Sequence, residues 1–428
     1  MIDFLAGKYR SVRFTFIQSN IFFLLGRQIF SGFWSIDCFF SASVINSRKV
    51  LQTLSPINSL LFFLIVLSAC KEKKVSTYTL VPPSDTLLQY NGRFHFNADS
   101  SMAKFAWTGS EINAKFEGTS CKILLKDNVY IKDGYGAPQA NYFYVFLDGG
   151  FPQLLRASPD STVYTIAKNL ADTSHTFKLF RRTEGATGST EFLGLRLDTG
   201  RSLLPYKASP SRRIEFIGNS ITCGYGNEGD SARCKYSSLT QNGYMTYSAI
   251  TSRSLDAEYR AVAYSGMGIY RNYSDAIRYT MTEMYDFVYP QNDSICWDHG
   301  QWQPHAVVVN LATNDFAKGN PKRAYFVESY FNLLEKIHVY YPEATIFCLG
   351  SPMMTDKYPR RRKARSTAKS YISEAIGKMK DLGMENIYYF GLSEQFSEVL
   401  GCDFHPNVVQ HQKNATELTA FISEKMDW

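Results

Sequence analysis

The spacing of hydrophobic residues changes near residue 210, and this change constrains the fold more than any other feature of the sequence. From about residue 88 to 202, hydrophobic and polar residues alternate in short runs that are separated by turn residues. Alternation with a period of two is typical of half-buried antiparallel strands, so this part is predicted to form a β-sandwich. The core positions of the runs are Ile112, Ala114, Phe116; Cys121, Ile123, Leu125; Phe143, Val145, Leu147; Phe177, Leu179; and Leu193, Leu195, Leu197.

From residue 212 to 428, continuous apolar strands alternate with helical stretches. Strands without alternation are buried on both faces, as in a parallel sheet covered by helices, so this part is predicted to be an α/β domain. A linker is expected between Leu203 and Pro210. The predicted strands are Arg213–Gly218, Glu258–Ser265, Ala306–Leu311, Thr345–Gly350 and Asn386–Phe390, and the predicted helices lie near 242–255, 274–285, 322–340, 363–382 and 410–425.

The N-terminal 69 residues are predicted to be a leader that belongs to neither domain. Arg48 and Lys49 precede a short apolar run that ends in Leu67-Ser68-Ala69-Cys70, and the run is too short to span a bilayer. The tetrapeptide resembles a bacterial lipobox, in which the cysteine receives a lipid and becomes the new N-terminus. We therefore expect a protein of the bacterial cell envelope, anchored through Cys70 on the periplasmic side or the outer surface, with residues 70–87 as a tether. A buried strand or helix with a chance cysteine is the alternative, and residues 1–47 are assigned no function.

The net charge and the cysteine spacing give no indication of nucleic-acid or metal binding. The net charge of the whole chain is +7, but residues 1–69 contribute +4 of it, which leaves +3 and gives no argument for nucleic-acid binding. The eight cysteines form no CxxC pair and no metal-ligand spacing, so neither a metal nor a cofactor is expected. Cys223 and Cys234 are a candidate disulfide pair in an oxidising periplasm, although the sequence leaves the connectivity open.

Residues suited to acyl transfer follow three of the predicted parallel strands, at the sheet edge where function collects. Ser220 lies in a glycine-containing turn, which exposes its hydroxyl and directs its own N–H into the site. Gly266 allows close approach of the backbone to a substrate, and Asn314 can donate a side-chain N–H to an oxyanion. Taken singly, these are also the residues of ordinary helix caps and turns.

The segment before the last predicted helix supplies a candidate base. His405 has a carboxylate, Asp403, two positions before it, and Pro406 after it. A carboxylate at this distance can orient the imidazole and stabilise its charged form. A lone histidine is more often structural, but the neighbouring Asp403 and Pro406 favour His405 as a base. The other histidines lack such neighbours.

Ser220, Gly266, Asn314 and His405 occur in the order and spacing of the SGNH (GDSL-type) hydrolases, which the chain resembles. More narrowly, it resembles carbohydrate esterase family 2, whose members place a small jelly-roll domain before the SGNH domain. The resemblance covers roughly residues 88 to 428, and its motifs lie at His175–Glu184, Phe216–Glu228, Trp302–Pro304 and Gly401–Asn407.

The resemblance implies a jelly roll at 88–202 and a flavodoxin-like, three-layer SGNH domain at 212–428. It also implies a serine esterase that removes O-acetyl groups from plant-type polysaccharides or oligosaccharides, such as acetylxylan or acetylmannan. Ser220 is expected to attack the acetyl carbonyl and His405 to take its proton, with Asp403 beside it. The N–H groups of Ser220 and Gly266 and the side chain of Asn314 are expected to hold the oxyanion.

Three positions depart from the common pattern of the SGNH hydrolases. Asn219 replaces the aspartate of the GDS motif, and Ala312 stands where a glycine is usual two residues before the asparagine. Asp403 stands two rather than three positions before the histidine, which fits family 2, where some members use a backbone carbonyl instead. Trp297 and Trp302 are candidates for stacking on sugar rings near the site, with core packing as the alternative.

Other functions remain open from the sequence. A GDSL-type lipase or thioesterase and a peptidoglycan O-acetyl esterase would use the same residues. A non-catalytic carbohydrate-binding lipoprotein would use the β-sandwich for binding.

Overall fold

The structure is a computed structural model that describes residues 77–428, except 135, 207–209 and 396–399. The leader, the proposed anchor Cys70 and the first part of the expected tether lie outside the described residues. The description below concerns the unit Ser76–Trp428. No helix in the described ranges has the length and apolar character needed to cross a membrane.

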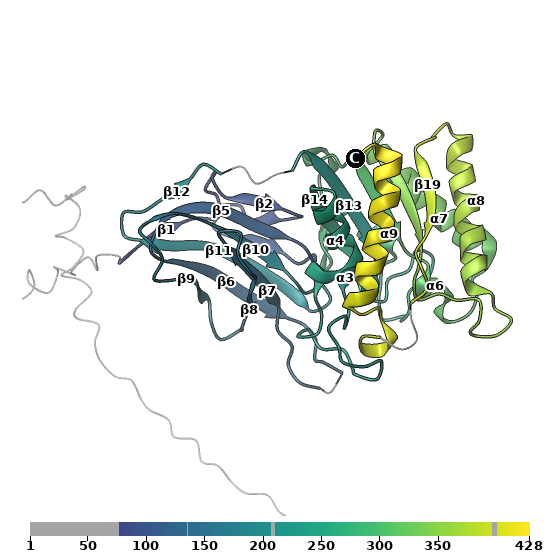
Figure 1. Cartoon of the computed structure of the whole chain (residues 1–428), viewed down its shortest axis with the longest axis horizontal. Coiled ribbons are helices and arrows are strands. Elements are labelled where there is room, and N and C mark those ends of the chain that lie inside the picture. The colour runs from purple at the N-terminus through teal and green to yellow at the C-terminus, as the bar shows by residue number, and fades with distance from the viewer. Residues whose placement is uncertain (1–76, 135, 207–209, 396–399) are drawn as a thin grey trace, which may run out of the picture. The chain divides into compact units, whose positions relative to one another are not determined.

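Residues 78–204 fold as two antiparallel sheets packed face to face, which confirms the predicted sandwich (Figure 1). One sheet has the order β3-β4-β11-β6-β9 with β1 beside β11, and the other has the order β12-β5-β10-β7-β8 with β2 beside β5. The aromatic core between them includes Phe105, Phe116 and Phe143. The strands are β1 Tyr78–Val81, β2 Gln89–Asn91, β3 His95–Phe96, β4 Ala103–Phe105, β5 Glu111–Gly118, β6 Cys121–Val129, β7 Tyr142–Leu147, β8 Gln153–Arg156, β9 Val163–Ala167, β10 Thr173–Arg181, β11 Gly188–Asp198 and β12 Leu203–Leu204.

The sandwich begins earlier and ends later than the sequence indicated. Strand β1 lies within the expected tether and pairs with β11, with Tyr78 opposite Asp198. Strand β12 lies within the expected linker and pairs with β5, with Leu203 opposite Phe116. Both are short edge segments whose placement depends on pairing with distant strands, and such pairing leaves little local signal.

The second part of the chain forms the predicted three-layer α/β domain around a parallel sheet of order β14-β13-β17-β18-β19. Helices α7 and α8 pack on one face of this sheet, and α4 and α9 pack on the other (Figure 1). The strands are β13 Arg212–Gly218, β14 Ala257–Ala263, β17 Ala306–Asn310, β18 Thr345–Gly350 and β19 Ile387–Gly391, with a hairpin of β15 Phe287–Tyr289 and β16 Asn292–Cys296. The helices are α3 Ser220–Cys223, α4 Tyr247–Ser254, α5 Met281–Met284, α6 Thr313–Ala317, α7 Arg323–Tyr340, α8 Ala364–Asp381 and α9 Val408–Met426, with 3-10 turns at Gly243–Met245, His299–Gln301 and Cys402–Phe404.

The helix predicted at 274–285 is wrong for most of its length, because only the turn α5 is helical. The side-chain amide of Asn272 donates to the carbonyl oxygens of Ile277 (2.9 Å) and Tyr279 (2.8 Å). These carbonyls are therefore satisfied by a side chain instead of by helical N–H groups, and the segment stays irregular.

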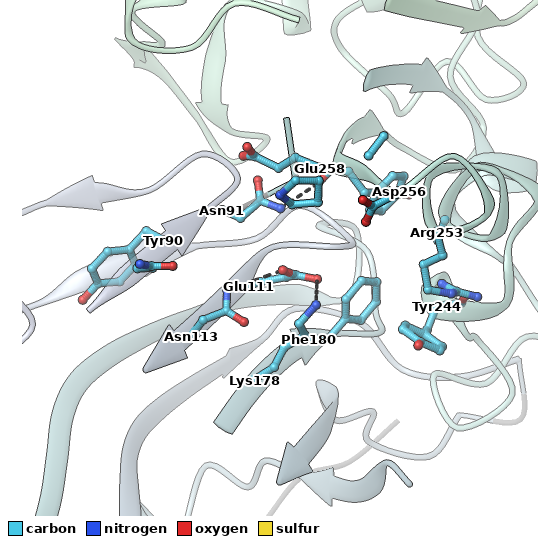
Figure 2. Close-up of a pocket in the computed structure, with 15 residues that line it drawn as sticks. Tyr90, Asn91, Glu111, Asn113, Lys178, Phe180, Tyr244, Arg253, Asp256 and Glu258 are labelled. Carbon is cyan, nitrogen blue, oxygen red and sulfur yellow. Dashed lines mark hydrogen bonds and ion pairs between the residues drawn. The ribbon is translucent and has the colours of Figure 1, made fainter. Parts of the chain in front are cut away.

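Buried polar contacts join the sandwich to the α/β domain. The Arg93 guanidinium lies 3.2 Å from a carboxylate oxygen of Glu215 in β13, and neither side chain is more than 3% exposed. The indole N–H of Trp107 donates to the carbonyl of Val288 at 2.8 Å. A polar groove of about 310 Å³ lies along the same boundary, between residues of β2, β5 and β10 on one side and of α4 and β14 on the other. Figure 2 shows side chains that line it, among them Asn91, Glu111 and Arg253. The two domains therefore share a buried, specifically paired interface.

Candidate active site

The serine turn follows β13 at the carboxyl end of the sheet. Asn219 caps α3, because its side-chain oxygen accepts a hydrogen bond from the Ile221 N–H at 3.2 Å. Gly218 has no room for a side chain, since a Cβ there would lie 2.0 Å from the hydroxyl oxygen of Thr222. Ser220 is the first residue of α3, so its own N–H has no acceptor within the helix and can face a ligand.

Ser220 and His405 lie side by side at the carboxyl end of the sheet, although they are 185 residues apart in the sequence. The serine Oγ lies 2.9 Å from Nε2 of the imidazole. The other ring nitrogen, Nδ1, lies 3.2 Å from the carbonyl oxygen of Cys402 and 3.1 Å from that of Asp403. Because a carbonyl oxygen only accepts, the proton of the neutral ring belongs on Nδ1, and Nε2 is the acceptor for the serine hydroxyl.

The His405 ring is held in its neutral form. Burial lowers its pKa to about 4, while the two backbone carbonyls at Nδ1 act in the opposite direction. At neutral pH the ring is therefore unprotonated and able to receive a proton.

The carboxylate of Asp403 lies elsewhere than the sequence led us to expect. One of its oxygens accepts from the Tyr225 hydroxyl (2.9 Å) and from the Tyr236 N–H (3.2 Å), and the other lies 3.3 Å from the Lys235 ammonium. Asp403 has left-handed backbone angles (φ 49°, ψ 40°), and in this conformation its carbonyl reaches the His405 ring. The prediction that its carboxylate accepts the Nδ1 proton is therefore wrong.

Tyr225 is a site residue that the sequence reasoning missed. Its ring stacks on that of His405, with centroids 4.3 Å apart and an interplanar angle of 30°. Its hydroxyl donates to Asp403, so the carboxylate helps to hold the tyrosine ring against the imidazole. The sequence signal was limited to a tyrosine between two glycines of the serine motif, which does not show where the ring points.

Gly266 and Asn314 line the same cleft as Ser220. Gly266 has a φ of 80°, in the left-handed region that favours glycine. One hydrogen of the Asn314 side-chain amide is donated to the carbonyl of Met267 at 2.8 Å, and the second is left for a ligand. The three groups predicted to hold an oxyanion therefore border one cavity.

Asp315 holds the loop that follows Gly266. Its carboxylate is fully buried and accepts from the consecutive backbone N–H groups of residues 269–271 at 2.8 to 3.1 Å. Burial raises its pKa to about 6, and the three hydrogen bonds act in the opposite direction. Asp315 thus fixes the loop that follows Gly266, a role that its place in the sequence did not reveal.

A second buried carboxylate reaches this loop from the sandwich domain. Glu184, between β10 and β11, accepts from the N–H (2.7 Å) and the hydroxyl (2.5 Å) of Ser265, next to Gly266. The Gln241 side chain also donates to it at 3.0 Å. The sandwich therefore contributes directly to the geometry of the candidate oxyanion site.

A disulfide bond joins Cys234 to Cys402. The candidate pair of Cys223 and Cys234 is therefore wrong, and Cys223 is a buried free thiol. The bond ties the loop that carries His405 to the loop after the serine turn, where the Asp403 N–H also donates to the Cys234 carbonyl at 3.0 Å.

The cleft above Ser220 and His405 has a volume of about 710 Å³. Three of its lining residues are exposed aromatics, Tyr273 (60%), Tyr358 (77%) and Phe404 (60%). No cluster of His, Cys, Asp or Glu that could hold a metal ion occurs in the part of the chain that the structure describes.

Trp297 and Trp302 do not border this cleft, so their predicted place beside the site is wrong. Trp302 is 8% exposed and packs against Arg260, whose guanidinium lies 4.2 Å from the ring centroid. The Arg93 guanidinium lies 5.5 Å from the ring centroid of Trp297. Trp302 precedes the amino end of β17, the edge of the parallel sheet opposite to Ser220.

Comparisons with known proteins agree with this geometry. Residues 90–206 match the family described as carbohydrate esterase 2 N-terminal, and residues 216–413 match the GDSL-like lipase/acylhydrolase family. A solved structure of a family two carbohydrate esterase from Clostridium thermocellum, in complex with cellohexaose, is 33% identical with a TM-score of 0.72. The match covers 80% of this chain and 99% of that one.

Two curated relatives are similar over most of the described residues. The cellulase/esterase CelE of Acetivibrio thermocellus is 33% identical over 340 residues, which are 79% of this chain but only 39% of that protein. An acetylxylan esterase / glucomannan deacetylase of Cellvibrio japonicus is 26% identical over 371 residues, which are 85% of this chain and 96% of the relative.

Proposed function

Because this chain belongs to the family 2 carbohydrate esterases, we propose that it is a serine esterase that removes O-acetyl groups from plant-type polysaccharides or oligosaccharides. The observation that carries the proposal is the 2.9 Å contact between the Ser220 hydroxyl and the unprotonated nitrogen of His405. The names of the relatives, acetylxylan esterase and glucomannan deacetylase, support substrates of the acetylxylan and acetylmannan type.

In the first half of the reaction, Ser220 attacks the acetyl carbonyl while Nε2 of His405 takes the hydroxyl proton. The positive charge that forms on the ring is balanced by the carbonyl oxygens of Cys402 and Asp403 at Nδ1. His405 then returns the proton to the sugar oxygen, which leaves as an alcohol. Water activated by the same imidazole hydrolyses the acetyl-enzyme to acetate.

The negative charge that develops on the carbonyl oxygen requires donors in fixed positions. The N–H groups of Ser220 and Gly266 and the free amide hydrogen of Asn314 supply them. Losing one such donor typically costs about 3 kcal/mol of barrier, so Asn314→Ala is expected to act mainly on kcat.

The exposed aromatic side chains around the cleft support a sugar substrate. A sugar ring has an apolar face that stacks on aromatic rings, and Tyr273, Tyr358 and Phe404 present such surfaces without closing the cleft. An open cleft of this kind admits an internal unit of a polymer.

The test is acetate release from acetylated xylan and acetylated glucomannan, compared between the wild type and Ser220→Ala. Turnover that Ser220→Ala abolishes supports the proposal. Binding of these glycans without acetate release would indicate a non-catalytic carbohydrate-binding lipoprotein instead. Faster turnover of long-chain nitrophenyl esters than of acetylated glycans would favour a GDSL-type lipase or thioesterase. Selective turnover of O-acetylated peptidoglycan would favour a peptidoglycan O-acetyl esterase.

For the location of the enzyme, we propose a lipid anchor at Cys70 and a place on the bacterial cell envelope, at the periplasmic side or the outer surface. The support is the tetrapeptide Leu67–Cys70 after a short apolar run and before the polar stretch Lys71–Lys74. Cys70→Ala is expected to move the protein to the soluble fraction. Membrane retention of this variant, with the leader removed, would contradict the anchor.

A further inference from the structure

A strongly basic segment follows β18 and leads into α8. Residues 356–365 contain six lysine or arginine side chains and one aspartate, a net charge of +5. The whole chain from Cys70 onward carries only +3, so the remainder of it is negative on balance. Positive charge is therefore concentrated in these ten residues, which are here called the basic segment.

Most cations of the basic segment have no carboxylate partner in the structure. The Arg365 guanidinium lies 3.8 Å from a carboxylate oxygen of Glu394 and donates to the carbonyl oxygens of Ser351 and Leu392. The Asp356 carboxylate accepts from the N–H and hydroxyl of Ser366. Within the described residues, the other five cations form no ion pair, and all but Arg362 are exposed. These five are Lys357, Arg360, Arg361, Arg362 and Lys363.

The basic segment forms part of the wall of the catalytic cleft. Tyr358, Pro359 and Arg362 line the same cavity as Ser220 and His405. The neighbouring helix does not offset the charge, because α8 begins at Ala364 with no acidic residue in its first turn. Its N-terminal partial positive charge adds to that of the side chains. The part of the cleft wall next to α8 therefore carries positive charge, and the Asp403 carboxylate, which lines another part, is paired with Lys235.

On the basis of the proposed function, we propose that the basic segment binds carboxylate groups of the substrate, so that the preferred substrates are acetylated glycans bearing uronic acid residues near the acetyl group. The planar guanidinium matches a carboxylate in a two-pronged hydrogen-bonded pair. Each exposed pair contributes little, but several along one polymer chain add up, and the potential also speeds encounter.

An anionic lipid surface is the other partner that such a segment could take. The position of Arg362 in the cleft wall favours the glycan, because a bilayer lying on the basic segment would cover the mouth of the cleft and exclude a polymer from Ser220. A glycan whose acetyl group sits at Ser220 passes over these side chains without any such conflict.

The test compares two xylo-oligosaccharides of equal length, one carrying two or three glucuronic acid branches and one without them, both chemically acetylated. At low salt, kcat/KM for acetate release is expected to be about tenfold higher for the charged substrate, as for two or three exposed ion pairs. At about 1 M salt, where the Debye length is about 3 Å, this preference is expected to disappear.

The charge-removing variant is Arg360→Gln/Arg361→Gln/Arg362→Gln, with its fold checked by circular dichroism. The matched control is Lys122→Gln/Arg156→Gln/Lys168→Gln, which removes the same charge from exposed positions on the sandwich. The first variant is expected to lose the preference for the charged substrate, and the control is expected to keep it. The salt dependence of the wild type tests the same point without any substitution.

Equal kcat/KM for the two substrates in the wild type overturns the inference but leaves the esterase function in place. The absence of acetate release from either substrate overturns the proposed function itself. If the variant keeps its preference but loses binding to phosphatidylglycerol vesicles, the basic segment serves a membrane surface and the inference is wrong.

Discussion

At the scale of single residues, the charge of His405 sets the acid limit of the reaction. The ring accepts a proton only when neutral, and burial lowers its pKa from an ordinary value of about 6.5 to about 4. We expect kcat/KM for acetate release to stay level from pH 7 to about pH 5 and to fall tenfold per pH unit below about pH 4. The profile is measured on the folded enzyme, checked by circular dichroism at each pH. An apparent pKa near 6.5 would show that the ring is not desolvated.

The role of Asp403 can be separated from that of its backbone. Asp403→Asn keeps the carbonyl that faces Nδ1 of His405, so we expect kcat/KM to fall by less than about tenfold. Ser220→Ala and His405→Ala are each expected to abolish most activity, and the double variant to be little worse. Tyr225→Phe, which removes the hydroxyl bonded to Asp403, is the matched comparison and should resemble Asp403→Asn. A loss near 10⁴-fold, as for the aspartate of a serine-protease triad, would return the carboxylate to the mechanism.

At the scale of elements, the cross-link between Cys234 and Cys402 holds the loop before α9. It closes a long stretch of chain, with a sequence separation of 168. Cys234→Ser/Cys402→Ser is expected to lower the free energy of unfolding by about 2–5 kcal/mol. It should also reduce kcat/KM, because the His405 loop loses its attachment. Denaturant titration and acetate release measure both effects.

The control for this prediction is Cys296→Ser, which changes an exposed thiol that forms no disulfide. It is expected to leave both quantities unchanged. Peptide mapping that finds Cys223 in a disulfide would contradict the connectivity.

The sequence predicted those elements whose burial is uniform along their length. Parallel strands such as β17 and β18 are apolar at nearly every position, so they could be located within one or two residues. The buried positions of strand β11 were harder to predict, because a bulge between Phe192 and Gly194 shifts the alternation of its inward- and outward-facing side chains. As a result Phe192 enters the core and Leu193, which the alternation placed there, is only partly buried.

The same limit applies to the site. Ser220, Gly266 and Asn314 follow strand ends, and the edge of a parallel sheet brings such positions together whatever their side chains do. The carboxylate of Asp403 and the indole of Trp302 depend instead on side-chain direction, which in Asp403 follows from a left-handed backbone. Disulfide pairing and the contact of Glu184 with Ser265 join distant segments, and no local pattern encodes them.

At the scale of the whole molecule, the sandwich takes part in the geometry of catalysis through Glu184. Glu184→Gln replaces a charged acceptor by an amide with one acceptor oxygen, which weakens the hold on the N–H and hydroxyl of Ser265. We expect kcat to fall by about 10- to 100-fold with little change in KM, since the displaced Gly266 acts on the transition state. The control is Glu191→Gln, which removes an ion pair with Lys126 in the same domain and should leave kcat unchanged. A parallel loss in both variants would point to general destabilisation.

The ion pair between Arg93 and Glu215 has a consequence for the ancestry of such enzymes. A buried charge whose partner is removed costs about 3–5 kcal/mol, and recombination that gives this catalytic domain an unrelated sandwich would leave Glu215 without its cation, bonded only to the Tyr285 hydroxyl. A new arrangement survives only if both halves arrive together or if Glu215 changes first. The pair therefore acts as a barrier to domain shuffling at residue 210, and the two halves are expected to share one genealogical tree.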